Sequence, residues 1–135
     1  MSASTGDAID DEARYLRFRG RLVADDPVEI KSGPGGLSFY VAVAGRRRFA
    51  CHFNARPRRA ESGRGFADFK PAETGLDADG VVSELERLLA DRAECRRGAA
   101  WWSAHFVASE DEAVASAFRA AVLGPLLAAG RPSGG

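Results

Sequence analysis

Residues 37–54 read LSFYVAVAGRRRFACHFN, and this stretch decides the fold expected for the chain of 135 residues. Apolar side chains occupy every second position on both sides of Gly45, and a period of two is typical of strands that bury one face. A glycine at that point also suits a tight turn. The stretch therefore predicts a β-hairpin with strands at 37–43 and 48–54. Its inward positions are Leu37, Phe39, Val41, Val43, Phe49, Cys51 and Phe53.

A third strand is predicted upstream of the hairpin, at residues 15–23. Leu16, Phe18 and Leu22 alternate there with arginines, so that the arginines share the face exposed to water. The acidic residues and proline of 25–27 end this strand. Residues 32–36 (SGPGG) are predicted to form a loop, because glycine and proline supply dihedral angles that strand interiors avoid.

Downstream of the hairpin, the sequence predicts two helices and up to two further strands. Residues 66–69 suggest a short edge strand, and 101–108 suggest a strand or an irregular connector. A helix that begins near Asp77 carries an apolar stripe at helical spacing. Its members are Val81, Val82, Leu85, Leu88, Leu89 and, beyond them, Cys95. Ser109 followed by Glu112 forms a capping box that predicts the start of the last helix.

Together these elements predict an α+β fold. We expect a two-layer sandwich in which three to four mostly antiparallel strands pack under two α-helices, in β-β-β-α-β-α order. Residues 14–130 form the single domain in this interpretation, because no internal repeat or linker divides them. Residues 1–13 and 131–135 are rich in small and polar residues, and we expect both to be flexible tails.

Composition indicates an ordinary globular protein of the cytoplasm. The apolar fraction is 45%, and a chain of this size can bury enough surface to fold without disulfides. Cys51 and Cys95 are expected to be buried thiols in a reducing compartment. The first 13 residues are acidic and lack the apolar segment of a secretory signal, and no continuous apolar run reaches the roughly 18 residues that cross a bilayer. We therefore expect a cytoplasmic protein with no membrane partner.

Charge is distributed unevenly although the formal net charge is zero. Residues 14–64 contain twelve basic side chains against four acidic ones. If the first three predicted strands are neighbours, their outward side chains form a basic, partly aromatic surface. We expect this sheet face to be the binding surface, with acidic helices behind it. Its candidate binding residues are Arg17, Arg19, Arg21, Tyr40, Arg48 and His52.

Three functions are compatible with this surface. The first is a small non-catalytic binding or accessory module that engages another macromolecule, a protein in our main hypothesis. The second is nucleic-acid binding through the arginines, since guanidinium groups contact phosphates and an aromatic ring can stack on a base. The third is a small-ligand carrier or enzyme with a pocket near Trp101, Trp102 and His105. Exposed edge strands also leave a homodimer open.

The sequence gives little support to catalysis, a metal or a cofactor. No nucleophile motif surrounds either cysteine or histidine. Cys51 and His52 are adjacent in a predicted strand, so their side chains point to opposite faces and cannot bind one zinc ion together. The glycine-rich residues 33–36 lack a following helix to hold a phosphate. We therefore expect no catalytic residue, no metal and no cofactor.

Overall fold

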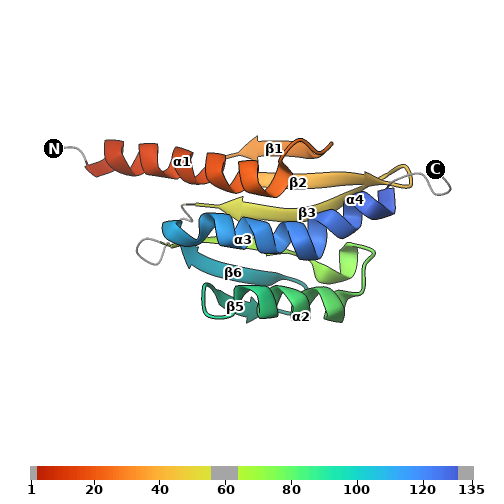
Figure 1. Cartoon of the computed structure of the whole chain (residues 1–135). Helices are drawn as coiled ribbons and strands as arrows, with labels where there is room; N and C mark the ends of the chain where they lie inside the picture. Colours follow the sequence, from red (N-terminus) through yellow and green to blue (C-terminus); the bar gives the residue numbers. More distant parts are fainter. Residues whose placement is uncertain (1–2, 56–63, 131–135) are drawn as a thin grey trace.

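The computed structural model describes residues 3–55 and 64–130. Their centre is a six-stranded antiparallel sheet with strand order β1-β2-β3-β4-β6-β5 (Figure 1). The strands are β1 (Glu29–Gly33), β2 (Gly36–Val43), β3 (Arg46–Asn54), β4 (Arg64–Phe69), β5 (Glu94–Arg97) and β6 (Trp102–Val107). The expected α+β class is therefore confirmed, whereas the number of strands and the element order differ from expectation.

The helices form a single layer. They are α1 (Ala3–Val23), α2 (Ala78–Leu89), α3 (Asp111–Phe118) and α4 (Gly124–Gly130), with a π-helical turn η3 (Arg119–Leu123) that joins α3 to α4. Short 3₁₀ turns η1 (Pro71–Glu73) and η2 (Ala108–Glu110) precede α2 and α3. Figure 1 shows the four α-helices on the same side of the sheet, and α3 packs against both α1 and α2.

Residues 15–23 form a helix, so the strand predicted there is wrong. Phe18 and Leu22 are fully buried and four residues apart, which places them on one face of a helix. Leu16, which the strand prediction buried, is 62% exposed. The helix extends back to Ala3, and most of the expected N-terminal tail 1–13 is therefore part of α1. Arg21 in the last turn of α1 suits the helix dipole. The expected C-terminal tail, 131–135, lies outside the described residues.

The hairpin β2–β3 is confirmed, but it contains an irregularity that the pattern did not reveal. Phe39 lies opposite Cys51, whereas the next residue, Tyr40, lies opposite Phe49. Ala50 is the extra residue of a β-bulge, and it is buried. Because side-chain direction alternates along a strand, the bulge reverses every position before it in β3. Phe49 therefore faces the side of Tyr40, and its predicted place in the core is wrong.

The remaining strands also differ from expectation. β4 lies in the middle of the sheet between β3 and β6, although it was predicted as an edge strand. The edges are β1 and β5, and β5 contains Cys95, which was assigned to the preceding helix. The capping box is also absent, because α3 begins at Asp111 without a side-chain cap hydrogen bond. η2 precedes it instead.

The core lies between the sheet and the helical layer. Its centre is a stack of Phe18 from α1, Phe53 from β3 and Phe106 from β6, with centroids of the first two rings 4.3 Å apart. The continuous helical stretch Ala108–Gly130 has a mean hydropathy of 1.5 and is long enough to cross a membrane, but half of its apolar window is buried within the fold. Here it serves as the central core helix of a small globular unit.

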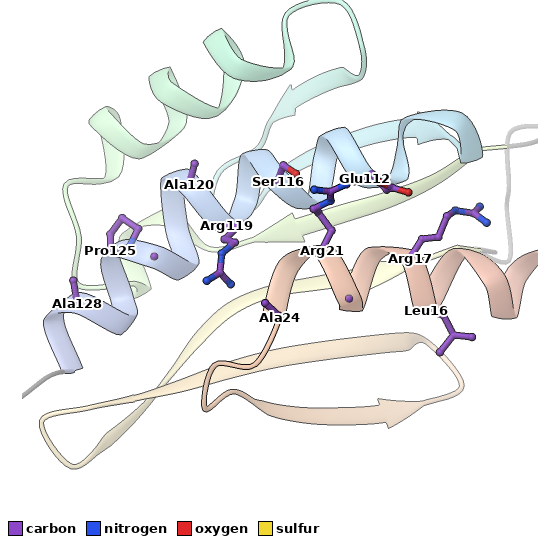
Figure 2. Close-up of a pocket in the computed structure, with 12 residues that line it drawn as sticks. Leu16, Arg17, Arg21, Ala24, Glu112, Ser116, Arg119, Ala120, Pro125 and Ala128 are labelled. Atoms are coloured by element: carbon purple, nitrogen blue, oxygen red, sulfur yellow. Dashed lines mark hydrogen bonds and ion pairs between the residues drawn. The ribbon is translucent and has the colours of Figure 1, made fainter.

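A shallow groove runs along the helical layer between α1 and the α3–α4 stretch (Figure 2). Small residues such as Gly20 and Ala120 line it, and Arg119 projects across its floor. The Arg119 guanidinium donates hydrogen bonds to the carbonyl oxygens of Leu22 at 2.7 Å and Val23 at 3.2 Å, and it pairs with Asp26. It thereby satisfies carbonyl groups that the end of α1 leaves without helical partners.

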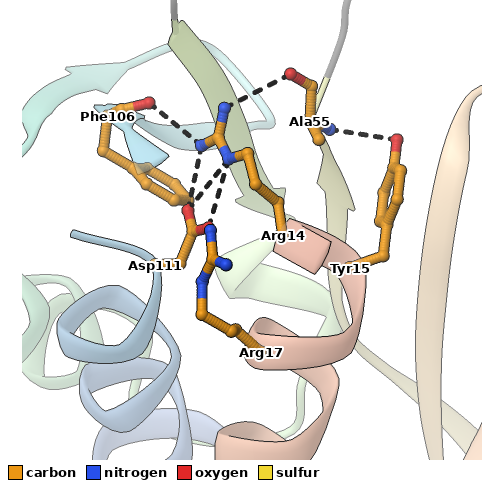
Figure 3. A network of polar contacts seen from close by, with 6 residues as sticks. All are labelled: Arg14, Tyr15, Arg17, Ala55, Phe106 and Asp111. Carbon is orange, nitrogen blue, oxygen red and sulfur yellow. Dashed lines mark hydrogen bonds and ion pairs between the residues drawn. The ribbon is translucent and has the colours of Figure 1, made fainter. Parts of the chain in front are cut away.

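A buried ion pair joins α1 to α3 (Figure 3). The Arg14 guanidinium lies 2.9 Å from the Asp111 carboxylate, and both side chains are at least 95% buried. Arg14 also donates to the carbonyl oxygens of Ala55, at 3.4 Å, and Phe106, at 3.3 Å. Arg17 reaches the second oxygen of Asp111 at 3.1 Å. This network connects α1, α3 and the ends of β3 and β6.

Candidate functional site

The side of the sheet opposite the helices consists of strand side chains, and we call it the open face. Burial alternates along β4 and β6 because one side of each strand faces the helices and the other faces away. Ala67 and Phe69 of β4 are buried, whereas Phe66 and Asp68 are half-buried on the open face. No α-helix of the described residues covers this side.

A hollow of about 440 Å³ lies on the open face over β2, β3 and β4. We call it the aromatic hollow. Its lining residues are Ser38, Tyr40, Phe49, His52, Phe66, Asp68, Lys70, Glu73 and Trp101. The rings form a connected wall, since the ring centroids of Tyr40 and Phe49 are 5.5 Å apart and those of Phe49 and Trp101 are 6.0 Å apart. The bulge in β3 is what brings Phe49 into this wall.

His52 is held in place by two hydrogen bonds. Its Nε2 lies 2.6 Å from the carbonyl oxygen of Gly35, which can only accept, so Nε2 carries the proton. Its Nδ1 lies 2.8 Å from the Ser38 hydroxyl, which donates to it. Burial lowers the pKa of His52, and the ring is neutral at physiological pH. The imidazole therefore ties β3 to the turn between β1 and β2.

Asp68 lies at the floor of the hollow with an incomplete set of partners. It is opposite His52 of β3 and Ser103 of β6 in the sheet register. Its Oδ1 is the single buried side-chain oxygen or nitrogen without a hydrogen-bond partner among the described residues. Burial raises the pKa of the Asp68 carboxyl to about 7. Near neutral pH the group is therefore partly ionised, and no ion pair joins it to another side chain in the described part of the chain.

Most other charged groups on the described open face form ion pairs, whereas Lys31 lies 5.7 Å over the Tyr40 ring. Arg47 lies 3.1 Å from Glu29 and 4.5 Å over the Tyr40 ring. Lys70 lies 3.5 Å from Glu73 and 4.9 Å over the Trp101 ring. At the other edge of the sheet, Glu94 accepts from both Arg64, at 3.2 Å, and Arg96, at 2.5 Å. The open face thus carries mixed and largely balanced charge, not the basic surface that the sequence predicted.

The structure separates the six predicted binding residues. Tyr40 and His52 lie together in the aromatic hollow. Arg17, Arg19 and Arg21 belong to α1, so their predicted place on a sheet face is wrong; Arg17 contacts Asp111, and Arg21 lies 2.6 Å from Glu112.

Arg48 is also not on the open face, because the bulge places it opposite the buried Val41. Its guanidinium donates to the carbonyl oxygen of Glu73 at 3.4 Å.

The three residues predicted to line a pocket near the tryptophans also lie in different places. Trp102 is buried in the core, and its indole N–H donates to Glu86 at 3.0 Å. Trp101, its neighbour, is 43% exposed and faces the aromatic hollow. A second hollow of about 340 Å³ is lined by both indoles, but His105 does not line it. His105 contacts the Ser103 hydroxyl at 3.1 Å instead, and burial together with the charges of Arg96 and Arg64 lowers its pKa.

Sequence reasoning placed only Tyr40, His52 and Trp101 of the hollow at a candidate site and missed the other six lining residues. Phe49 was assigned to the core because the bulge leaves no mark in the alternating pattern. Phe66 and Asp68 alternate with Ala67 and Phe69, and this signal was present, but the segment was too short to establish its direction. An acidic residue between two phenylalanines of a buried strand was the clue available.

The thiols do not form a reactive or metal-binding group in the described part of the chain. Both cysteines are free. Cys51 faces the core side of β3, and burial raises its pKa well above the usual range, with a smaller contribution from the Asp68 charge. Residues 3–55 and 64–130 contain no cluster of three histidine, cysteine or acidic residues that could hold a metal ion.

Known proteins offer no relative from which a role for these residues could be transferred. No protein-family model, curated protein or solved structure matches this chain.

Proposed function

We propose that this protein is a non-catalytic binding module that engages another protein through the open face, with the aromatic hollow at the centre of the contact. One observation carries the proposal: partly exposed aromatic rings converge on a side of the sheet that the helices leave uncovered. Rings that remain outside the core expose apolar surface to water, and association with a partner removes this cost.

The composition of the open face favours a protein as the partner. Tyrosine and tryptophan are frequent at the centres of protein interfaces, and balanced charges are typical of their polar rims. Here Tyr40, Phe49 and Trp101 form the centre, whereas the Arg47–Glu29 and Arg64–Glu94 pairs lie around it. A rim of this kind complements a partner surface that carries both signs of charge.

The two alternatives have less support. Nucleic-acid binding requires guanidinium groups directed at phosphates, and the arginines placed on the open face are engaged with glutamates. A carrier or enzyme with a pocket that joins an indole to His105 has less support, because the hollow beside Trp101 and Trp102 is not lined by that histidine.

Photocrosslinking tests the proposal. A benzophenone amino acid is placed at Tyr40 on the open face or, as a control, at the exposed Leu16 of α1, and each protein is irradiated in an extract of its native host. We expect one protein to be crosslinked from position 40 and not from position 16. With that protein purified, Trp101→Ala should weaken binding at least about 10-fold by calorimetry, as expected for an aromatic residue at an interface centre, and Leu16→Ala should not.

The proposal is wrong if both positions crosslink the same proteins, if position 40 yields none, or if it yields nucleic acid. Thermal unfolding of each variant establishes that a loss of binding does not reflect a loss of fold.

A further inference from the structure

The charges around the aromatic hollow leave one negative group uncompensated. The charged or titratable groups around Asp68 are His52 opposite it on β3, Lys70 and Glu73 in the lining of the hollow, Cys51 on the core side of β3, and Arg96 of β5, which shares the partner Ser103 with Asp68 and pairs with Glu94. Lys70 and Glu73 form an ion pair, and His52 is neutral. The ionised carboxylate of Asp68 is therefore the excess charge of the hollow, and it attracts a cation.

Two rings of the hollow already have cations of the same chain over them, and Lys31 also lies 5.7 Å from the Tyr40 centroid. The guanidinium of Arg47 lies 4.5 Å from the Tyr40 centroid, and the ammonium of Lys70 lies 4.9 Å from the Trp101 centroid. Aromatic rings attract cations through their negative faces, most strongly where water is excluded. Phe49 contacts both of these rings and lies between them. The wall beside Asp68 thus has the composition of a cation-binding cage.

The site suits a guanidinium group better than an ammonium group. A guanidinium is planar, stacks on aromatic rings and is less strongly hydrated than an ammonium group. It therefore loses less hydration free energy when it enters a half-buried hollow. It also donates several hydrogen bonds from one plane, and the partnerless Oδ1 of Asp68 can accept one of them.

From these contacts we infer that the aromatic hollow takes an arginine side chain of the protein partner, with the rings against its guanidinium and the Asp68 carboxylate as its counter-ion. This inference rests on the proposed function, since it names the chemistry of the partner at the same site. Among residues 3–55 and 64–130 the Oδ1 of Asp68 has no hydrogen-bond partner, and in this inference the partner protein supplies one.

The inference is tested with a defined probe, the peptide acetyl-Gly-Ser-Gly-Arg-Gly-Ser-Gly-amide, followed by NMR titration of the folded protein. Its twins carry citrulline, which has the same shape without the charge, or lysine. A single side chain binds weakly, with a dissociation constant on the order of 1 mM. We expect the arginine peptide to bind about 10-fold tighter than the citrulline peptide at pH 8, and the lysine peptide to fall between them, with shifts centred on β2, β3 and β4.

The pH dependence follows from the carboxyl group. With a pKa of about 7, Asp68 is ionised in about nine tenths of molecules at pH 8 and about one tenth at pH 6, so arginine binding should weaken several-fold over this range. Asp68→Asn should remove both the preference over citrulline and the pH dependence. Glu94→Gln, which removes an open-face carboxylate outside the hollow, should leave both intact.

Equal binding of arginine and citrulline peptides, no binding up to about 10 mM, or an unchanged preference in Asp68→Asn would each overturn the inference. Thermal unfolding of that variant shows whether it is folded. If the peptides fail while position 40 still crosslinks one protein, the open face is an interface with a different central contact. Failure of the crosslinking experiment instead removes the proposed function itself.

Discussion

Asp68 places a carboxyl group where the fold offers it little support, and this makes the residue a cost to stability. Its pKa is raised from an ordinary value of about 4 to about 7. The folded state therefore holds the proton more tightly than the unfolded state. The contribution of the protonated Asp68 carboxyl to the free energy of unfolding is fully present below pH 4, and it is lost as the pH rises towards and through 7.

Replacement of Asp68 by asparagine should consequently stabilise the protein at high pH. Asparagine resembles the protonated carboxyl group and does not ionise, so we expect a gain of about 1 to 2 kcal/mol at pH 8, once partial exposure is allowed for, and little change at pH 4. Urea unfolding at the two pH values measures this difference. A destabilised variant at pH 8 would show that the carboxylate supports the fold.

Individual side-chain directions could be predicted from the sequence only where the strand is regular. Tyr40 and His52 face outward as the alternating pattern predicted. Phe49 and Arg48 do not, because one extra residue in β3 reverses the two faces before it. A β-bulge cannot be recognised from the alternating pattern when the extra residue, here Ala50, is small and apolar enough to be buried.

Among the helices and strands, α1 differs most from the prediction, because the sequence pattern predicted a strand at residues 15–23. Residues 15–23 satisfy a period of two through Leu16, Phe18 and Leu22, but Tyr15, Phe18 and Leu22 also satisfy a helical period. Nine residues are too few to separate the two periods when arginines occupy most other positions. The good helix formers Glu12, Ala13 and Arg14 directly precede this segment and favour a helix, whereas Ser, Thr, Gly and Asp, which dominate residues 1–11, do not.

The packing of α1 on α3 depends on the buried pair of Arg14 and Asp111. Asp111→Asn leaves the guanidinium buried without its counter-ion, and we expect a loss of about 3 to 5 kcal/mol in the free energy of unfolding. The matched control is Glu112→Gln, which breaks the partly exposed pair with Arg21 between the same helices and should cost less than about 1 kcal/mol. Urea denaturation at pH 7 compares them, and similar losses would contradict the role assigned to burial.

Across the whole molecule, the unevenly distributed charges mainly form ion pairs with one another. Arg14, Arg17 and Arg21 of α1 meet the acidic start of α3, whereas Arg47 and Arg64 of the sheet each meet a glutamate two strands away. The numbers of basic and acidic residues in the two parts of the sequence are as counted. The ion pairs that join different helices and strands depend on the tertiary structure, so they could not be predicted from the sequence.

This pairing predicts that the protein does not bind nucleic acid strongly. A glutamate would have to be displaced from Arg47, Arg64 and Arg96 before these arginines could contact phosphate, so few counter-ions would be released there on binding. We expect fluorescence anisotropy with a mixed single-stranded oligonucleotide pool to show no saturable binding at 50 mM salt. Binding that is tight at 50 mM and lost by 200 mM salt would favour the nucleic-acid alternative.

The order of the strands in the sheet also affects how the aromatic hollow can change during evolution. β1 to β4 are neighbours in space in the same order as in the chain, and every lining residue of the aromatic hollow except Trp101 lies between positions 38 and 73. The helices and β6 that build the core against it are encoded elsewhere. Exchange of one contiguous coding segment would therefore transfer nearly the whole aromatic hollow between related genes, together with most of β2 to β4, and leave the helices, β5 and β6 in place.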